Sequence, residues 1–184
     1  MCHWKAALRV VRYLKGTRDL KLRLGGDGNI SLSGYSDSDY GNCLDTWKSV
    51  SGYCFSLGSG LISYASRKQK TIATSTTEAE YVAVSEACRE VCWLRQVLKE
   101  LDLEQCNPTP LLCDNNGAIA LSSDPTFHAR VKHIDVRHHF IREKVEDKTI
   151  FITRVPSREN LADIFTKPLG RTEFLQFRPL LGLL

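Results

Sequence analysis

The sequence predicts an α/β domain built on a mixed sheet of about five strands with flanking helices. From Ile30, apolar and polar residues alternate with period two in three successive runs, which is typical of an antiparallel three-strand meander. In the second half, short apolar strands alternate with helical segments, which implies two parallel strands joined by right-handed crossovers. The chain has 184 residues, 42% of them apolar, which allows one core but not two full domains.

Residues 3–15 predict an amphipathic helix, because Trp4, Leu8 and Val11 lie on one stripe and Gly16 follows as a stop signal. Residues 19–29 read as a short strand and a glycine-rich turn. The meander strands are expected at residues 30–39, 49–57 and 61–66.

A long helix is expected at residues 75–101, where Ser75 and Glu78 form the capping-box pattern. After it, residues 109–114 and 148–155 predict strands. Residues 115–123, 133–147 and 157–169 predict helices, the last of them stopped by Pro168.

The composition excludes several classes of protein. There is no run of about 18 apolar residues, and residues 1–16 lack the features of a secretory signal, so we expect no membrane partner and a cytoplasmic or nuclear location. Seven scattered cysteines without a C-x-x-C pair favour reduced thiols. The net charge of +4 suits a polyanionic partner, and nothing in the sequence indicates an oligomeric state.

Acidic residues stand at the ends of two predicted strands. Asp37 lies near the end of the first strand, and Asp114 ends the strand at residues 109–114. If the long helix is the crossover between them, these strands are parallel neighbours whose carboxyl ends share a crevice. Asp39 would lie on the same strand face as Asp37, which is costly for like charges unless a cation is close.

Helical register separates two glutamates at the start of the long helix. Glu80 is in register with the apolar stripe that must face the sheet, whereas Glu78 lies about 200° away round the helix. We therefore expect Glu78 to cap the helix and Glu80 to point inward, where an ionised carboxylate needs a partner or a metal. Asp163, at the start of the last predicted helix, can lean toward the same crevice.

Each of these acids alone is more simply read as a helix cap or a solvated group. Together they favour a hard-cation site, because no basic residue is close in sequence to Asp37, Glu80 or Asp114. Oxygen ligands suit Mg²⁺ or Mn²⁺, and a carboxylate cluster can hold two such ions. Two bridged ions are the standard arrangement for phosphodiester hydrolysis.

Five segments occur in order between about Ile30 and Leu169: GYSDSDYGNC, SVSGYCFSLGSGLISYASRKQKTIATSTTEAEYVAVSEA, LLCDNNGAIALS, VKHIDVRHHFIREKV and NLADIFTKPL. With them the chain resembles the ribonuclease H domain of copia-type LTR retrotransposon Pol polyproteins. The leading HWKAALRVVRYLKGT resembles the last helix of the reverse transcriptase that precedes this domain.

The resemblance implies a ribonuclease H-like fold and hydrolysis of the RNA strand of RNA–DNA hybrids. The family's two Mg²⁺ ions, for which Mn²⁺ can substitute, would be held by its Asp-Glu-Asp-Asp set. That set falls on Asp37, Glu80, Asp114 and Asp163, which are then both the catalytic residues and the metal ligands. Asp37 is then the bridging ligand, and Asp39 an outer acid that orders the loop or faces the same ions.

The resemblance also implies a division of the chain. Residues 1–28 would be a reverse transcriptase remnant, residues 29–170 the ribonuclease H domain, and residues 171–184 a C-terminal tail. The reverse transcriptase region of the parent polyprotein is then an expected partner, and a virus-like particle the setting of the parent element. Many ribonucleases H carry a histidine before the final aspartate; here the loop VPSREN has none, so we expect either that Arg158 or Glu159 substitutes in part or that turnover is slower.

Two basic patches are expected to contact the phosphates of the hybrid. Several short polar residues are expected to lie near the 2′-OH. The nucleic-acid-binding candidates are Arg67, Lys68, Lys70, Thr76, Thr77, Asn115, Asn116, Lys132, His133 and Arg158.

The alternative function is that of a retroelement remnant that binds nucleic acid without cutting it. The presence of all four acids argues against that alternative.

Overall fold

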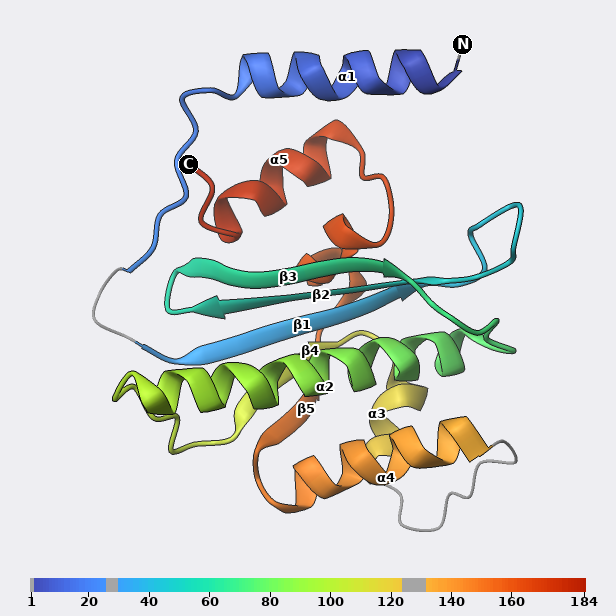
Figure 1. Cartoon of the computed structure of the whole chain (residues 1–184), viewed down its shortest axis with the longest axis vertical. Coiled ribbons are helices and arrows are strands. Elements are labelled where there is room, and N and C mark those ends of the chain that lie inside the picture. The colour runs from blue at the N-terminus through green and yellow to red at the C-terminus, as the bar shows by residue number, and fades with distance from the viewer. Residues whose placement is uncertain (1, 26–29, 124–131) are drawn as a thin grey trace.

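The computed structural model describes residues 2–25, 30–123 and 132–184. Its centre is a five-stranded sheet in the order β3-β2-β1-β4-β5 (Figure 1). The strands are β1 (Leu32–Asp39), β2 (Val50–Leu57), β3 (Gly60–Lys68), β4 (Thr109–Cys113) and β5 (Ile150–Arg154). β1, β2 and β3 form an antiparallel meander, and β4 pairs in parallel with β1 and β5, so the predicted mixed sheet is confirmed.

The helix α2 (Thr76–Glu100) crosses one face of the sheet and carries the chain from β3 to β4 (Figure 1). This crossover makes β1 and β4 parallel neighbours, so their carboxyl ends lie at the same edge. The stripe of α2 that contains Val84 and Val91 is fully buried against Phe55 and Leu111 of the sheet. Two further helices, α3 (Asn116–Ser123) and α4 (Lys132–Glu146), lie on the same side.

The predicted cap of α2 is formed with one difference. Ser75 Oγ accepts a hydrogen bond from the backbone N–H of Glu78 at 3.1 Å. The Glu78 carboxylate accepts from the N–H and hydroxyl of Thr74 instead of from Ser75, completing the cap one residue earlier than a capping box would. Glu78 therefore caps the N-terminus of α2, as its position round the helix predicted.

The opposite face of the sheet is covered by η1 (Ser157–Glu159), η2 (Leu161–Phe165) and α5 (Arg171–Leu180) (Figure 1). A second, smaller apolar cluster lies there, with Cys54, Leu161, Phe177 and Leu181 buried. Gly52 of β2 allows η2 to approach closely, because a Cβ at this position would lie 2.6 Å from the Thr166 side chain.

The prediction of one helix at residues 157–169 is wrong. Asn160 has an extended backbone and caps the turn that follows it, so two short 3-10 helices form instead. The residues expected as a tail contain α5, whose Phe177 belongs to the second cluster.

The first helix, α1 (Cys2–Gly16), lies beyond α5 and contacts it through the rings of Tyr13 and Phe174, whose centroids are 5.7 Å apart (Figure 1). Its apolar stripe is exposed, with Trp4 at 68% and Val11 at 59%. Within the part of the chain that the structure describes, no helix is long and apolar enough to cross a membrane.

The prediction of a strand after α1 is wrong: residues 19–25 form no strand. This segment forms only an isolated bridge between Leu22 and Leu183, because its pairing partner is the short C-terminal stretch and no longer ladder can extend. The backbone of Lys21 exchanges hydrogen bonds of 2.7 and 3.0 Å with Leu184, and Arg23 N donates to Gly182 O. The expected domain boundary at residues 28 and 29 lies outside the described residues.

Candidate active site

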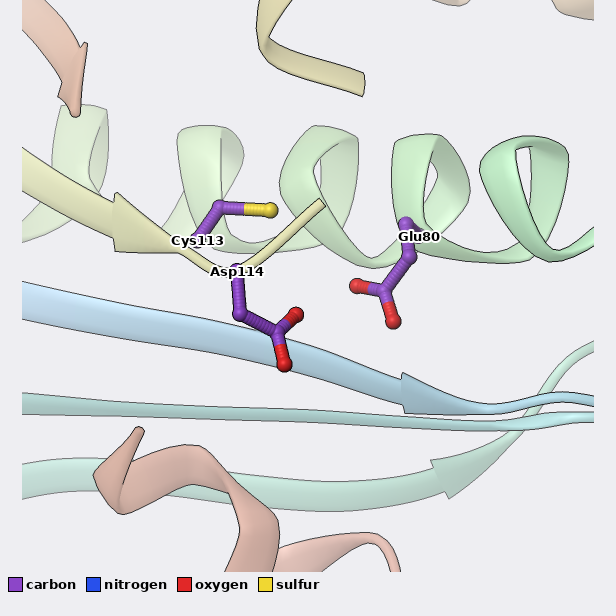
Figure 2. A group of neighbouring side chains, drawn as sticks. All are labelled: Glu80, Cys113 and Asp114. Atoms are coloured by element: carbon purple, nitrogen blue, oxygen red, sulfur yellow. The ribbon is translucent and has the colours of Figure 1, made fainter. Parts of the chain in front are cut away.

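Four carboxylates from four separate segments meet at the carboxyl end of β1. Asp37 is near the end of β1, Glu80 is in the first turns of α2, Asp114 directly follows β4, and Asp163 is in η2. Asp114 is half-buried and the other three are buried. Asp37 is an electrostatic neighbour of the other three, and oxygens of Glu80 and Asp114 lie within 4.8 Å of each other (Figure 2). The structure therefore brings the four predicted acids together.

Cys113 is the third member of the compact group in Figure 2, with its Sγ within 4.8 Å of oxygens of Glu80 and Asp114. Burial raises the pKa of Cys113 to about 12, so its thiol stays protonated. A neutral thiol is a poor ligand for a hard cation, which prefers oxygen. The carboxylates are the ligands that this group offers to a metal such as Mg²⁺.

Burial affects the protonation of two of the buried acids, Glu80 and Asp37. It raises the pKa of Glu80 to about 9, and the charges of Asp37 and Asp114 act in the same direction. Burial also raises the pKa of Asp37 to about 7, with a contribution from Asp163, although a hydrogen bond from Thr166 opposes the rise. The cluster cannot hold all its negative charges without a cation.

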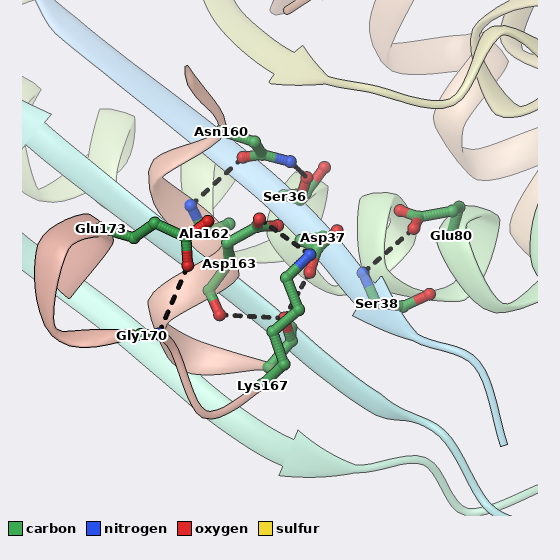
Figure 3. A network of polar contacts seen from close by, with 11 residues as sticks. Ser36, Asp37, Ser38, Glu80, Asn160, Ala162, Asp163, Lys167, Gly170 and Glu173 are labelled. Atoms are coloured by element: carbon green, nitrogen blue, oxygen red, sulfur yellow. Dashed lines mark hydrogen bonds and ion pairs between the residues drawn. The ribbon is translucent and has the colours of Figure 1, made fainter. Parts of the chain in front are cut away.

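Asn160 fixes η2 to the end of β1 (Figure 3). Its Nδ2 donates to the backbone oxygen of Ser36 at 3.0 Å, and its Oδ1 accepts from Ala162 N at 3.2 Å. At the other end of η2, Thr166 Oγ1 donates to Asp37 Oδ2. These contacts place Asp163 beside Asp37, although the two are far apart in the sequence.

Among the residues that the structure describes, two buried carboxylate oxygens of the cluster have no hydrogen-bond partner. Glu80 Oε1 accepts from Ser38 N at 3.3 Å, but Glu80 Oε2 has none, and neither has Asp163 Oδ1. Buried polar atoms are normally satisfied, and a metal ion is one of the groups that can satisfy a carboxylate. The residues therefore fit a divalent cation.

Asp39 is hydrogen-bonded to the loop that follows β1 and to the start of β2. Its carboxylate accepts hydrogen bonds from Val50 N and from Asn42 Nδ2, the latter at 3.1 Å. Of the two roles expected for Asp39, these contacts support the ordering of the loop.

The structure groups the first basic patch with residues of α2 and α4. Arg67, Lys68 and Lys70 are exposed at the end of β3 and beyond it. They lie round a pocket of about 310 Å³ whose lining also includes Tyr53, Glu86, Arg89, Glu90 and Arg137. The pocket is rich in positive charge, as a phosphate-binding surface requires.

The other nucleic-acid candidates are dispersed. Thr77 lies against the start of α3, because a Cβ on Gly117 would be 2.9 Å from its hydroxyl. Asn115 Oδ1 caps α3 by accepting from Ala118 N at 2.9 Å. Thr76 and Asn116 are exposed near these residues.

Arg158 is also exposed, and it pairs with the adjacent Glu159 at 3.2 Å. Lys132 and His133 begin α4, and their side chains fall outside the described part of the structure.

Sequence reasoning missed four residues of this region. Asn160 and Thr166 position the acids, Lys167 pairs with Asp163 at 2.8 Å, and Arg89 lines the basic pocket. The only sequence signal was the cap-forming type of Asn160, directly before LADIF. The other three act through contacts with distant segments.

Comparison with curated proteins finds relatives over nearly the whole chain. A retrovirus-related Pol polyprotein from transposon TNT 1-94 of Nicotiana tabacum is 43% identical over 181 residues, covering 98% of this chain and 14% of the polyprotein. The Pol polyprotein from transposon RE2 of Arabidopsis thaliana is 40% identical over 182 residues, covering 99% of this chain and 12% of that protein. The chain thus spans only a small part of the relatives it matches. No protein-family model matches it.

Solved structures similar to this chain include ribonucleases H and a viral protease-reverse transcriptase. The RNase H1 of Halobacterium salinarum has a TM-score of 0.52 at 15% identity, covering 74% of this chain and 94% of that one. The protease-reverse transcriptase of a foamy virus, solved with an RNA/DNA hybrid, has a TM-score of 0.54 at 14% identity and covers 79% of this chain and 21% of that one. At this identity the likeness shows the fold.

Proposed function

Because this chain is homologous over nearly its whole length to copia-type plant Pol polyproteins and has the ribonuclease H fold, we propose that it hydrolyses the RNA strand of RNA–DNA hybrids. The observation that carries the proposal is the meeting of Asp37, Glu80, Asp114 and Asp163, with unpartnered buried oxygens on Glu80 and Asp163. A fold alone does not specify chemistry, so the proposal is supported by this constellation of acids.

Each acid has a proposed role in holding metal. Asp37 would be the shared ligand, because it is the electrostatic neighbour of the other three. Two Mg²⁺ ions, or Mn²⁺ in their place, would activate the attacking water and stabilise the departing oxygen. Thr166 holds the Asp37 carboxylate in place, and Asn160 fixes the turn that carries Asp163. Both act by limiting the motion of ligands.

The hybrid would lie across the acidic cluster and the basic pocket. The cations of that pocket, with Arg67 and Lys70 at its rim, would contact backbone phosphates without regard to sequence. Thr77 and Asn115, which lie at the starts of α2 and α3, would face the sugar edge. The solved complex of LC11-RNase H1 with an RNA/DNA hybrid has this fold at a TM-score of 0.52, which supports a hybrid as the ligand.

The proposal extends to the setting of the chain. Residues 1–28 would be the end of a reverse transcriptase, residues 29–170 the ribonuclease H domain, and residues 171–184 an appended segment. The exposed stripe of α1 supports a former contact with a polymerase, because an apolar face of this kind normally packs against a partner. The parent element would use the domain in the cytoplasm, in the nucleus or in a virus-like particle.

Cleavage of an end-labelled RNA–DNA hybrid tests this proposal. We expect the purified chain to cut the RNA strand in Mg²⁺ or Mn²⁺, but not after chelation and not in duplex DNA. Asp114→Asn should abolish cleavage and leave hybrid binding equal or stronger, because a negative charge is removed from the site. A hybrid left intact in both metals, or full activity in the variant, would contradict the proposal.

A further inference from the structure

Lys167 is a positive charge inside the acidic cluster. Its Nζ lies 2.8 Å from Asp163 Oδ2, and its side chain is 43% exposed while that of Asp163 is 9% exposed. Figure 3 shows the lysine reaching back from the end of η2 over Asp163 and Asp37. Asp37, Asp163 and Asp114 are all its electrostatic neighbours. This half of the cluster is therefore partly neutralised before any metal binds.

The other half has no equivalent. The charged neighbours that act on Glu80 are Asp37 and Asp114, both acidic. One oxygen of Glu80 accepts from the backbone N–H of Ser38 at 3.3 Å, and among the described residues its second, buried oxygen has no hydrogen-bond partner. The cluster is thus asymmetric: Lys167 forms an ion pair with Asp163, whereas among the described residues no basic side chain is paired with Glu80.

This asymmetry has a consequence for cations. An ion that binds at Glu80 and Asp114 displaces a proton from Glu80 but no basic side chain of the described residues. An ion that binds at Asp163 must either displace the ammonium group of Lys167 or accept its repulsion at close range. Lys167 and the metal ion compete for the carboxylate of Asp163. The affinity of the metal ion for Asp163 is therefore lower, the stronger the ion pair with Lys167 is.

We propose that Lys167 acts as a built-in cation that holds the Asp163 side of the cluster, so that one divalent ion binds first at Glu80 and Asp114 and a second binds only by displacing Lys167. Lys167 is a positioning residue in this arrangement, since it acts through Asp163. The inference rests on the proposed metal-dependent function. It adds the order in which the two ions bind and their unequal affinities.

Calorimetric titration of the full chain with Mn²⁺, without nucleic acid, tests the inference. We expect two binding events of unequal affinity in the unaltered protein. Lys167→Met should tighten the weaker event by about three- to tenfold and leave the stronger one within about twofold. Asp163→Asn should remove the weaker event, and Asp114→Asn should weaken the stronger one.

The matched control is Lys99→Met, because Lys99 forms a 3.2 Å pair with Glu104 at the far end of α2. It should leave both events unchanged. Lys167→Arg keeps the charge and should keep the weaker event weak, whereas Lys167→Gln should behave like the methionine variant if the latter folds poorly. Circular dichroism establishes that each variant is folded.

The outcomes separate the two proposals. If Lys167→Met leaves the weaker event unchanged, weakens it, or shifts both events equally, the role given to Lys167 is wrong while the metal site stands. If the unaltered protein and Lys167→Met both show a single Mn²⁺-binding event, the role given to Lys167 is likewise wrong and the metal site stands. If no ion binds in a carboxylate-dependent manner, the metal-dependent function fails with it.

Discussion

Asp37 and Glu80 are acids that burial keeps from ionising. The pKa of Asp37 is raised to about 7 and that of Glu80 to about 9, so in the folded, metal-free chain both stay protonated at pH values where the unfolded chain has lost the protons. In the unfolded chain both carboxyl groups titrate at about pH 4. Between these values the folded state binds more protons than the unfolded state.

This difference predicts how stability changes with pH. Both groups contribute to the free energy of unfolding, and this contribution is fully present below about pH 4. It is lost as the pH rises through about 7 and then about 9. The reason is that stability falls with pH wherever the folded state holds more protons than the unfolded state. Urea unfolding in chelator should therefore give a lower midpoint at about pH 8 than at about pH 5. Adding Mg²⁺ should recover more stability at the higher pH, because a bound ion replaces the lost protons.

Glu80→Gln provides the control for this experiment, because glutamine is neutral at every pH and nearly isosteric. The variant should show a smaller fall between the two pH values. A metal-free midpoint that does not fall with pH, or falls equally in the variant, would show that the buried acids are not the cause.

Asn160 joins η2 to β1 and so determines where Asp163 lies. Asn160→Ala would leave the buried carbonyl of Ser36 and the N–H of Ala162 without their partner. We expect a loss of about 1–3 kcal/mol in the free energy of unfolding and a higher Mg²⁺ concentration for half-maximal cleavage. Chemical denaturation and a Mg²⁺ titration of activity measure the two effects.

The matched control is Asn116→Ala, since Asn116 is exposed at the start of α3. It should leave the free energy of unfolding nearly unchanged. An Asn160→Ala protein that is destabilised but keeps its Mg²⁺ requirement would show that the turn does not position Asp163.

The N-terminal segment has two parts that should respond differently to truncation. Removing residues 1–20 deletes α1, whose exposed stripe includes Trp4 and Val11, and should reduce self-association with little change in stability. Removing residues 1–29 also deletes the backbone bonds between residues 21–23 and 182–184, at a cost of roughly 1–3 kcal/mol. Light scattering and thermal unfolding of the two proteins measure these effects. Equal stability of both would contradict a structural role for the bridge at Leu22.

The arrangement of the sheet and the inward direction of Glu80 could be predicted because both depend on local patterns. Period-two alternation defines the meander, and helical register separates Glu80 from Glu78 within a single turn. A crossover helix then leaves few possible positions for β4. Most of the fold could therefore be predicted from the sequence, as could the four acids that the structure brings together.

The remaining features depend on contacts between distant segments. The Asn160 bond to Ser36 joins residues 124 positions apart, and Arg89 joins the basic pocket only because α2 packs against β2, the neighbour of β3 in the sheet. The two 3-10 helices replaced the predicted helix because Asn160 contacts β1. No periodicity in one segment reports such contacts, so Lys167 and Thr166 could not be identified from the sequence.

The account of the whole chain depends on one claim, that the inward-facing carboxylates hold the metal that cuts the hybrid. Hybrid cleavage by Glu80→Gln and Glu78→Gln tests it most directly, because the two glutamates lie two residues apart on α2 and only Glu80 enters the cluster. We expect Glu80→Gln to reduce Mg²⁺-dependent cleavage by more than about a hundredfold, and Glu78→Gln to retain it with a small loss of stability from the cap. Equal cleavage by the two variants, or a greater loss in Glu78→Gln, would contradict the account.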